Sequence, residues 1–456
     1  MLLRTKKTKT HITQSILAIS CTIFRYQSRS LTLNNTNTRA MSTIQATDPI
    51  ADPDEGKKTS TLTSFQGSLR SVYGDLSPSV ISNPETWIPP PRSGGHRGRY
   101  LWTDAFGVLN LITLHREASD LQDTIKHHYL ILAKRLVETV HDVLGRTRDG
   151  RARLPGATDS NPVGGGLRIG KIDPDGPDAD GQYHHYLTVW MFALNRLSLA
   201  TDEPKYNQLA VALARAIHPR FMRNRESDRP RLAWKMRTDL SAPLVTSEGN
   251  LDPVDGFVVF RLLQATARAQ CEREHDAVDG HGEENILDDE IEDYRRIMRR
   301  KGEQFVSTDP LDLGMTLWTV HWFAEREEWA AAIAKSCINQ MCKETTIIQA
   351  YRHPYLPTYY ILDTLFEIDR YLQFPARYRL PFREFGTCLG ICCHVEQQSE
   401  KQQHFIDLDG YADAILRFWE PIMELSAQGS DEDDLKAINK VMYASALIPG
   451  GEFAIV

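Results

Sequence analysis

The chain has 456 residues, of which 41% are hydrophobic and 25% charged, and its formal net charge is -7 at pH 7. This apolar fraction is sufficient for a large core, while the net negative charge argues against a nucleic-acid partner. No apolar run approaches the roughly 18 residues of a membrane-spanning helix, so the sequence predicts no transmembrane segment.

The first 40 residues differ in composition from the rest of the chain. Residues 1–40 contain seven Lys or Arg residues, twelve Ser or Thr residues and no Asp or Glu. This composition is typical of a mitochondrial transit peptide; the alternatives are a secretory signal built on the apolar stretch 15–24, or a chain that starts at Met41. The six later Cys residues lack the density of a disulfide scaffold. They favour an intracellular, cytoplasmic protein, or a mitochondrial one if the leader is genuine.

Residues 41–98 are rich in polar, Pro and Gly residues, which is typical of a linker. We therefore predict a disordered leader over 1–40, a polar linker over 41–98 and a folded domain over 99–456.

The stretch 164–171, GGGLRIGK, raises the question of a nucleotide site. Gly165 to Lys171 matches the spacing of a P-loop, but the next residue, Ile172, has no hydroxyl for Mg²⁺. Turn-rich segments flank the stretch in place of a buried strand and a helix. We interpret it as the start of a long loop beside a pocket, where Arg168 and Lys171 counter nearby carboxylates or bind an anionic sugar group.

Helical periodicity dominates the rest of the chain. The clearest case is 181–221, where apolar residues recur at helical spacing on both sides of a turn at Asp202 and Pro204. Similar patterns predict helices at 103–120, 127–145, 254–270, 290–305, 311–325, 327–341, 357–372, 411–425 and 434–447. The short links indicate about six helical hairpins of unequal period.

Three segments carry a resemblance to a known architecture: 99–110 (RYLWTDAFGVLN), 154–171 (LPGATDSNPVGGGLRIGK) and 176–197 (GPDADGQYHHYLTVWMFALNRL). With the hairpin series, they resemble the six-hairpin glycosidases and their relatives. The resemblance implies an all-α fold, an (α/α)6 toroid or six-hairpin barrel, in which the first helices of the hairpins start at one mouth. No catalytic pair of a particular glycosidase family maps onto this chain by motif.

If the hairpins close in this way, the loops before their first helices supply the chemistry. Asp104, Asp180 and Asp255 are the candidate catalytic carboxylates, because glycoside hydrolysis requires a proton donor and a second carboxylate as base or nucleophile. The same loops also contain Asp178, Asp252, Asp309 and Asp312. The alternative for each aspartate is a helix cap, since Asp accepts hydrogen bonds from N-terminal amides and gains from the helix dipole.

Sugar binding requires aromatic platforms and polar groups. The candidate substrate-binding residues are Trp102, Arg168, Gln182, His185, Trp190, Glu248, Trp318, His321, Arg352 and His353, with Trp234 and Trp322 as further platforms. Tryptophan offers a face on which a sugar ring stacks, although tryptophan at helical spacing is more often a core residue.

Histidines open a second chemistry. His184, the remaining candidate catalytic residue, lies about 100° from His185 around a helix, so one of the two is expected to face the cavity. An epimerase of the toroid class would use paired histidines as acid and base, and a lyase would combine a His or Tyr base with an Arg. The alternative for each histidine is a buried, hydrogen-bonded structural role.

The sequence predicts no metal or other cofactor. The run CLGICCH over 388–394 lacks both C-x-x-C spacing and the second half of a zinc pair. Two function classes remain, with a carbohydrate or another small molecule as the ligand. The first is a carbohydrate-active enzyme, of glycoside hydrolase type or else an epimerase or lyase. The second is a non-catalytic helical scaffold or sugar-binding protein.

Overall fold

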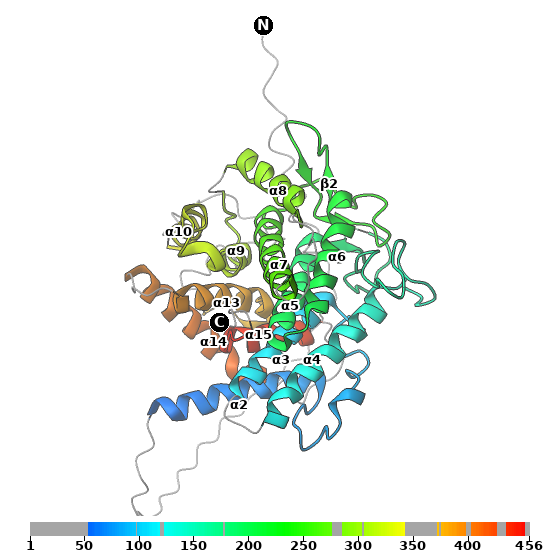
Figure 1. Ribbon diagram of the computed structural model, residues 1–456. Coiled ribbons are helices and arrows are strands. Elements are labelled where there is room, and N and C mark those ends of the chain that lie inside the picture. Colours follow the sequence, from blue (N-terminus) through cyan, green and yellow to red (C-terminus); the bar gives the residue numbers. More distant parts are fainter. Residues whose placement is uncertain are drawn as a thin grey trace, which may run out of the picture.

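A computed structural model describes residues 53–96, 98–118, 123–176, 178–275, 285–302, 305–342, 372–373, 375–397, 403–425 and 435–451. The protein is mostly helical and belongs to the all-α class, as predicted (Figure 1). The helices are α2 (Pro53–Tyr73), η2 (Pro84–Thr86), α3 (Leu101–Glu117), α4 (Asp123–Leu144), α5 (His184–Thr201), α6 (Pro204–Phe221), α7 (Asp252–His275), α8 (Asp288–Lys301), α9 (Pro310–Ala324), α10 (Glu328–Cys342), η3 (Ala376–Tyr378), α13 (Pro381–Gln397), α14 (Gln403–Leu425) and α15 (Lys436–Leu447). None of these helices has the length and apolar character needed to cross a membrane.

Two pairs of short antiparallel strands hold loops between the helices together. The strand β1 (Gln182–Tyr183) pairs antiparallel with β4 (Lys235–Met236), and β2 (Met222–Arg223) pairs antiparallel with β3 (Arg231–Leu232). The first pair joins the residues that precede α5 to the long connection between α6 and α7, so it fixes two of the loops that surround the site.

Successive helices pack as hairpins: α3 with α4, α5 with α6, α7 with α8, α9 with α10, and α13 with α14. The first helices also pack on one another, α3 on α5, α5 on α7, α7 on α9, α9 on α13, α13 on α15, and α15 on α3. Figure 1 shows these first helices near the centre and α4, α6, α8, α10 and α14 toward the outside. Both the first helices and the second helices of the hairpins contribute apolar side chains to the core.

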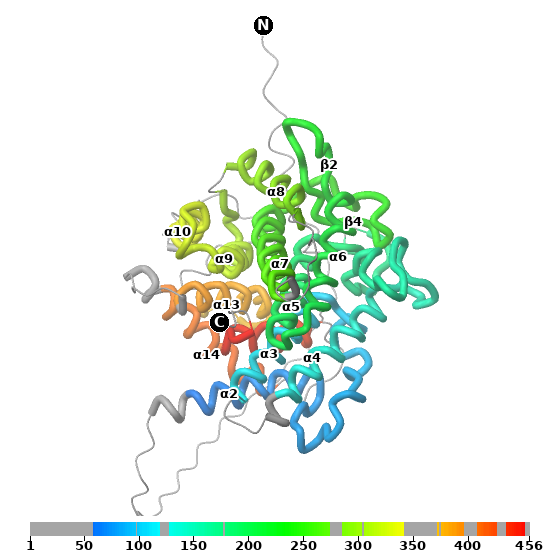
Figure 2. The backbone as a smooth tube through the Cα atoms, viewed as in Figure 1, coloured from blue at the N-terminus to red at the C-terminus, as the bar shows by residue number. Residues whose placement is uncertain are grey.

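The N-terminal helix α2 differs from the sequence-based prediction of a polar linker over 41–98. Phe65, Leu69 and Tyr73 are buried in the core, and α2 packs on α15 and α14 (Figure 2). The described residues before Arg99 are therefore part of the helical body. Burial of one apolar face against α15 supplies the stability that the Ser- and Thr-rich sequence of α2 lacks by itself.

The segment 381–397, which includes the cysteine-rich run, is a helix that the sequence analysis did not predict. Its glycines permit a close crossing with α9: a Cβ at Gly390 would overlap the backbone of Gly314, and a Cβ at Gly314 would overlap that of Thr387. Cys388 and Cys393 are buried in this helix, and the Cys388 thiol donates to the backbone oxygen of Ala412 in α14. The glycine and cysteine residues of the run 388–394 thus serve helix packing.

Candidate functional site

A cavity of about 310 Å³ lies where the first helices begin. Its wall contains residues from the first three positions of α3, α5, α7, α9, α13 and α15, together with the loops before them. Residues far apart in sequence, such as Trp102 and Ile438, therefore share one space.

Four carboxylates line this cavity: Asp178, Glu248, Asp252 and Asp312. Asp178 is ion-paired with Lys171, and Glu248 lies 2.6 Å from Arg300 Nη2. Asp252 Oδ1 lies 3.4 Å from His184 Nδ1, and this oxygen has no hydrogen-bond partner among the described residues. A Cβ at Gly249 would overlap Oδ2 of Asp252, so glycine is required beside this carboxylate.

Asp312, in the first turn of α9, has a strongly raised pKa. Burial, reinforced by the negative charge of Asp309, raises its pKa from 3.8 to about 6, against the opposing effects of Arg383 and hydrogen bonds from Ser307 and Asn250. A carboxyl with this pKa is protonated to a useful degree near neutral pH, as a general acid requires.

His185 also lines the cavity, and it is hydrogen-bonded to the buried carboxylate of Asp255, which does not line the cavity. Its Nδ1 hydrogen-bonds with Oδ2 of Asp255, while Thr319 Oγ1 donates to Oδ1 of Asp255 at 2.8 Å. Burial alone would lower the pKa of His185, but Asp255 together with the negative charges of Asp252 and Asp312 outweighs this effect, and the pKa is raised. The Nε2 atom of His185 has no hydrogen-bond partner within the described residues. These three side chains link α5, α7 and α9.

An aromatic wall faces the carboxylates. The Trp102 ring lies 4.7 Å from that of His185 and 5.0 Å from that of Tyr186, centroid to centroid. Trp234 packs edge-on against Tyr183 at 5.6 Å. Ring faces of this kind bind the apolar faces of sugars.

Aliphatic and aromatic carbon side chains form a further wall, contributed by Leu251, Leu311, Leu380, Phe382, Leu435 and Ile438. These residues lie at the starts of α7, α9, α13 and α15.

The predicted catalytic carboxylates Asp104 and Asp180 are not among the residues that line this cavity. Asp104 is buried, lies 3.4 Å from Arg99 Nη1 and accepts a hydrogen bond from Tyr73 Oη at 3.1 Å. The structure places both aspartates in ion-paired, buried positions away from the cavity. Asp255 lies behind His185, and His184 is buried against Tyr294 Oη at 2.7 Å.

Asp180 organises the loop that contains GGGLRIGK. Its Oδ2 accepts hydrogen bonds from Arg148 and Arg168 at 3.1 Å each, and its Oδ1 accepts from the backbone N–H groups of Gly170, Lys171 and Gly181. The Gln182 side chain clamps the same loop, donating to Gly165 O and accepting from Leu167 N. These contacts explain why a polar, glycine-rich loop holds one conformation.

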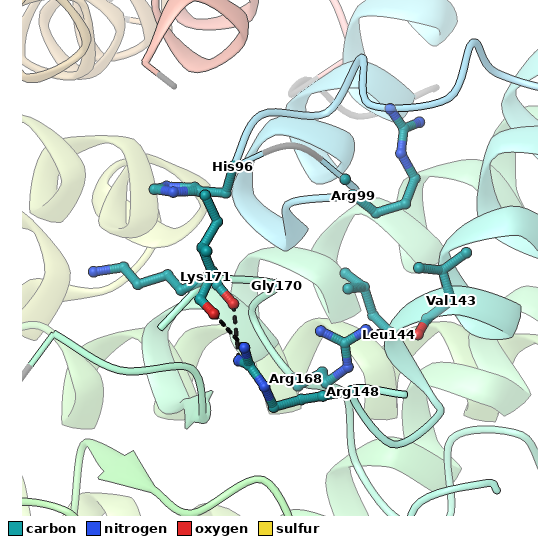
Figure 3. Close-up of a pocket in the computed structure, with 10 residues that line it drawn as sticks. His96, Arg99, Val143, Leu144, Arg148, Arg168, Gly170 and Lys171 are labelled. Atoms are coloured by element: carbon teal, nitrogen blue, oxygen red, sulfur yellow. Dashed lines mark hydrogen bonds between the residues drawn. The ribbon is translucent and has the colours of Figure 1, made fainter. Parts of the chain in front are cut away.

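A second cavity, of about 280 Å³, adjoins this loop (Figure 3). His96 and Lys171 line both cavities. Arg148 and Arg168 face the second one, and Figure 3 shows the hydrogen bonds of Arg148 to backbone carbonyls of the loop. These arginines brace the loop through Asp180 and carbonyl oxygens.

The remaining predicted binding residues divide into three groups. Trp102, His185 and Glu248 line the main cavity. Trp190, Trp318 and His321 are buried in the core, where burial lowers the pKa of His321 to about 3. Arg352 and His353 lie outside the described residues. Asp252 and Asp312 line the cavity but were not among the predicted site residues, because spacing in the sequence does not distinguish a carboxylate that caps a helix from one that faces a cavity.

Within the described ranges, no group of three or more His, Cys, Asp or Glu side chains is arranged to hold a metal ion. Comparisons with protein-family models, curated proteins and solved structures find no match to this chain.

Proposed function

We propose that the chain is a carbohydrate-active enzyme of glycoside hydrolase type, built on an (α/α)6 toroid whose mouth is the main cavity. The contacts among first helices, which run from α3 through α15 and back to α3, support the toroid. The observation that carries the activity is Asp312, whose pKa is raised to about 6 in a cavity that also contains a second carboxylate, Asp252, and two tryptophans.

The proposed chemistry uses these groups in distinct roles. Protonated Asp312 donates its proton to the glycosidic oxygen as the bond to the sugar breaks. Asp252 acts on the opposite side as base or nucleophile. Trp102 and Trp234 hold the apolar faces of the sugar, which fixes its orientation.

The test is hydrolysis of a panel of p-nitrophenyl α- and β-D-glycosides by the full chain. Asp312→Asn and Asp252→Asn are each expected to lower kcat by roughly 100-fold or more, because a positioned acid or base contributes at least that factor. Asp413→Asn, at an exposed carboxylate on α14 that pairs with Arg417, is the matched control and should leave kcat unchanged. Absence of turnover on the whole panel, or equal turnover in all variants, would reject the proposal.

A sugar epimerase is the second candidate, and the His185–Asp255 pair favours it. A histidine with one nitrogen fixed by a carboxylate and the other toward a cavity can move a proton at a sugar carbon next to a carbonyl. Incubation of free aldoses with the protein in D2O distinguishes the two: an epimerase incorporates deuterium at C2, and His185→Asn abolishes incorporation. A sugar-binding protein would bind the sugars but produce neither result.

A further inference from the structure

The main cavity has two chemically different halves. One half holds Asp252, His185, Trp102 and Trp234, contributed by α3, α5, α7 and the β1–β4 loops. The other half is mainly hydrocarbon and comes from the starts of α9, α13 and α15: Leu311, Leu380, Phe382, Leu435 and Ile438, with Arg383 as its charged residue, held in an ion pair with Asp309. One cavity therefore presents most of its hydrogen-bonding groups at one end and few at the other.

A sugar alone does not fit this division. Branched aliphatic side chains offer neither a flat ring face nor a hydrogen-bond partner, so hydroxyl groups placed against them would lose their bonds to water without replacement. An apolar group placed there would gain by leaving water. The cavity volume of about 310 Å³ lies at the small end of ligand pockets, which is too small for a chain of sugar units.

The position of the proposed acid joins the two halves. Leu311 and Asp312 are consecutive in the first turn of α9, one in the aliphatic wall and the other among the carboxylates. Asp312 also contacts Asn250 of the loop before α7 and lies near Arg383 of α13. Its carboxyl therefore stands at the boundary, where the oxygen between a sugar and an apolar substituent would lie.

We propose that the ligand is a small amphiphilic glycoside, one sugar unit linked to an apolar aglycone, with the sugar against the tryptophans and the aglycone against Leu380 and Phe382. This inference rests on the proposed function, because it assigns the bond between the two parts to Asp312.

Matched pairs of methyl and hexyl D-glucopyranosides and D-galactopyranosides, in both anomers, test the inference. They share the sugar and a similar alkoxide leaving group and differ in hydrocarbon length. Affinity is followed by tryptophan fluorescence, since Trp102 and Trp234 line the cavity, and hydrolysis by released reducing sugar. Leu380→Asn makes the aliphatic wall polar; the position immediately precedes α13, where Asn is a favourable N-cap, so the variant is expected to fold. Ile88→Asn, at an exposed aliphatic residue outside the cavity, is the matched control.

We expect the hexyl member of at least one pair to bind about tenfold or more tightly than the methyl member, and Leu380→Asn, but not Ile88→Asn, to remove most of that ratio. Equal affinities within every pair would overturn the amphiphilic ligand, while released sugar would leave the hydrolase intact. A hexyl preference without hydrolysis would support the ligand class and reject the hydrolase. Absence of binding by all pairs would overturn both.

Discussion

The raised pKa of Asp312 makes a prediction about stability that requires no substrate. The folded-state pKa, about 6, exceeds the ordinary value of 3.8, so the native state binds the proton more tightly than the unfolded state. Stability therefore falls as pH rises between these two values, and the whole penalty is present above pH 6. The difference between the two pKa values corresponds to about 3 kcal/mol. Asp312→Asn removes the charge and should remove most of this penalty.

The assay compares the unfolding midpoints of Asp312→Asn and wild type from pH 4 to pH 8. At pH 4 the two proteins should be within about 0.5 kcal/mol, because the wild-type carboxyl is then protonated in the native state. Above pH 7 the variant should be the more stable one, with a midpoint higher by a few degrees. Asp413→Asn should show no such dependence. A difference between variant and wild type that stays constant across this pH range would refute the assignment of a raised pKa to Asp312.

Three further predictions test the parts that support the site. Asp255→Asn should lower the pKa of His185, because burial is then opposed only by the charges of Asp252 and Asp312; histidine NMR titration measures it. Asp180→Asn should destabilise the fold by about 3 kcal/mol, since the amide oxygen can still accept from the three backbone N–H groups but the amide NH2 leaves Arg148 and Arg168 without their charged acceptor; denaturant unfolding measures the loss. Gly166→Ala should destabilise by more than about 1 kcal/mol, because Gly166 has φ +74° and a Cβ would overlap a side chain, whereas Gly67→Ala, within α2, should stabilise by about 0.5–1 kcal/mol.

Within the described residues, the sequence predicted the helices that carry strong apolar periodicity, and it failed where composition disguised that periodicity; the predicted helix over 357–372 lies almost wholly outside those residues. In α2, Leu62, Phe65, Leu69 and Tyr73 follow helical spacing, but the Ser, Thr, Lys and Gly residues between them are typical of a linker. The stability of α2 comes from its contact with α15, near the other end of the chain, and local propensity does not reveal such a contact. The helical stripe was the signal that would have identified it.

In the site, too, the local sequence predicted which loops come together, but not which of their carboxylates have ion-pair partners. The loops before the first helices were predicted to share one space, and residues of these loops do line the cavity. The choice among their carboxylates depended on partners that the sequence does not show. Asp104 and Asp180 are each placed beside an arginine, Arg99 in one case and Arg148 in the other. Asp312 has no ion-pair partner of its own in the described structure, and Arg383 pairs instead with Asp309.

Asp309 controls the acidity of Asp312 through two separate effects. As the N-cap of α9 it accepts the backbone N–H groups of Leu311, at 2.9 Å, and Asp312, at 3.3 Å, so these amides do not stabilise the neighbouring carboxylate. Its negative charge also raises the pKa of Asp312, and it holds Arg383 in an ion pair.

Asp309→Asn keeps the cap, since Asn is an equally good N-cap, but removes the charge and releases the guanidinium of Arg383 toward Asp312. Both changes favour the ionised form of Asp312, so its pKa should fall from about 6 toward 3.8. In the Asp309→Asn background, the stabilising effect of Asp312→Asn should still begin near pH 4, but it should level off about one pH unit or more lower than in the wild-type background, and its final size should shrink. If the effect levels off at the same pH and with the same size in both backgrounds, the capping aspartate has no part in raising the pKa of Asp312, and burial sets it instead.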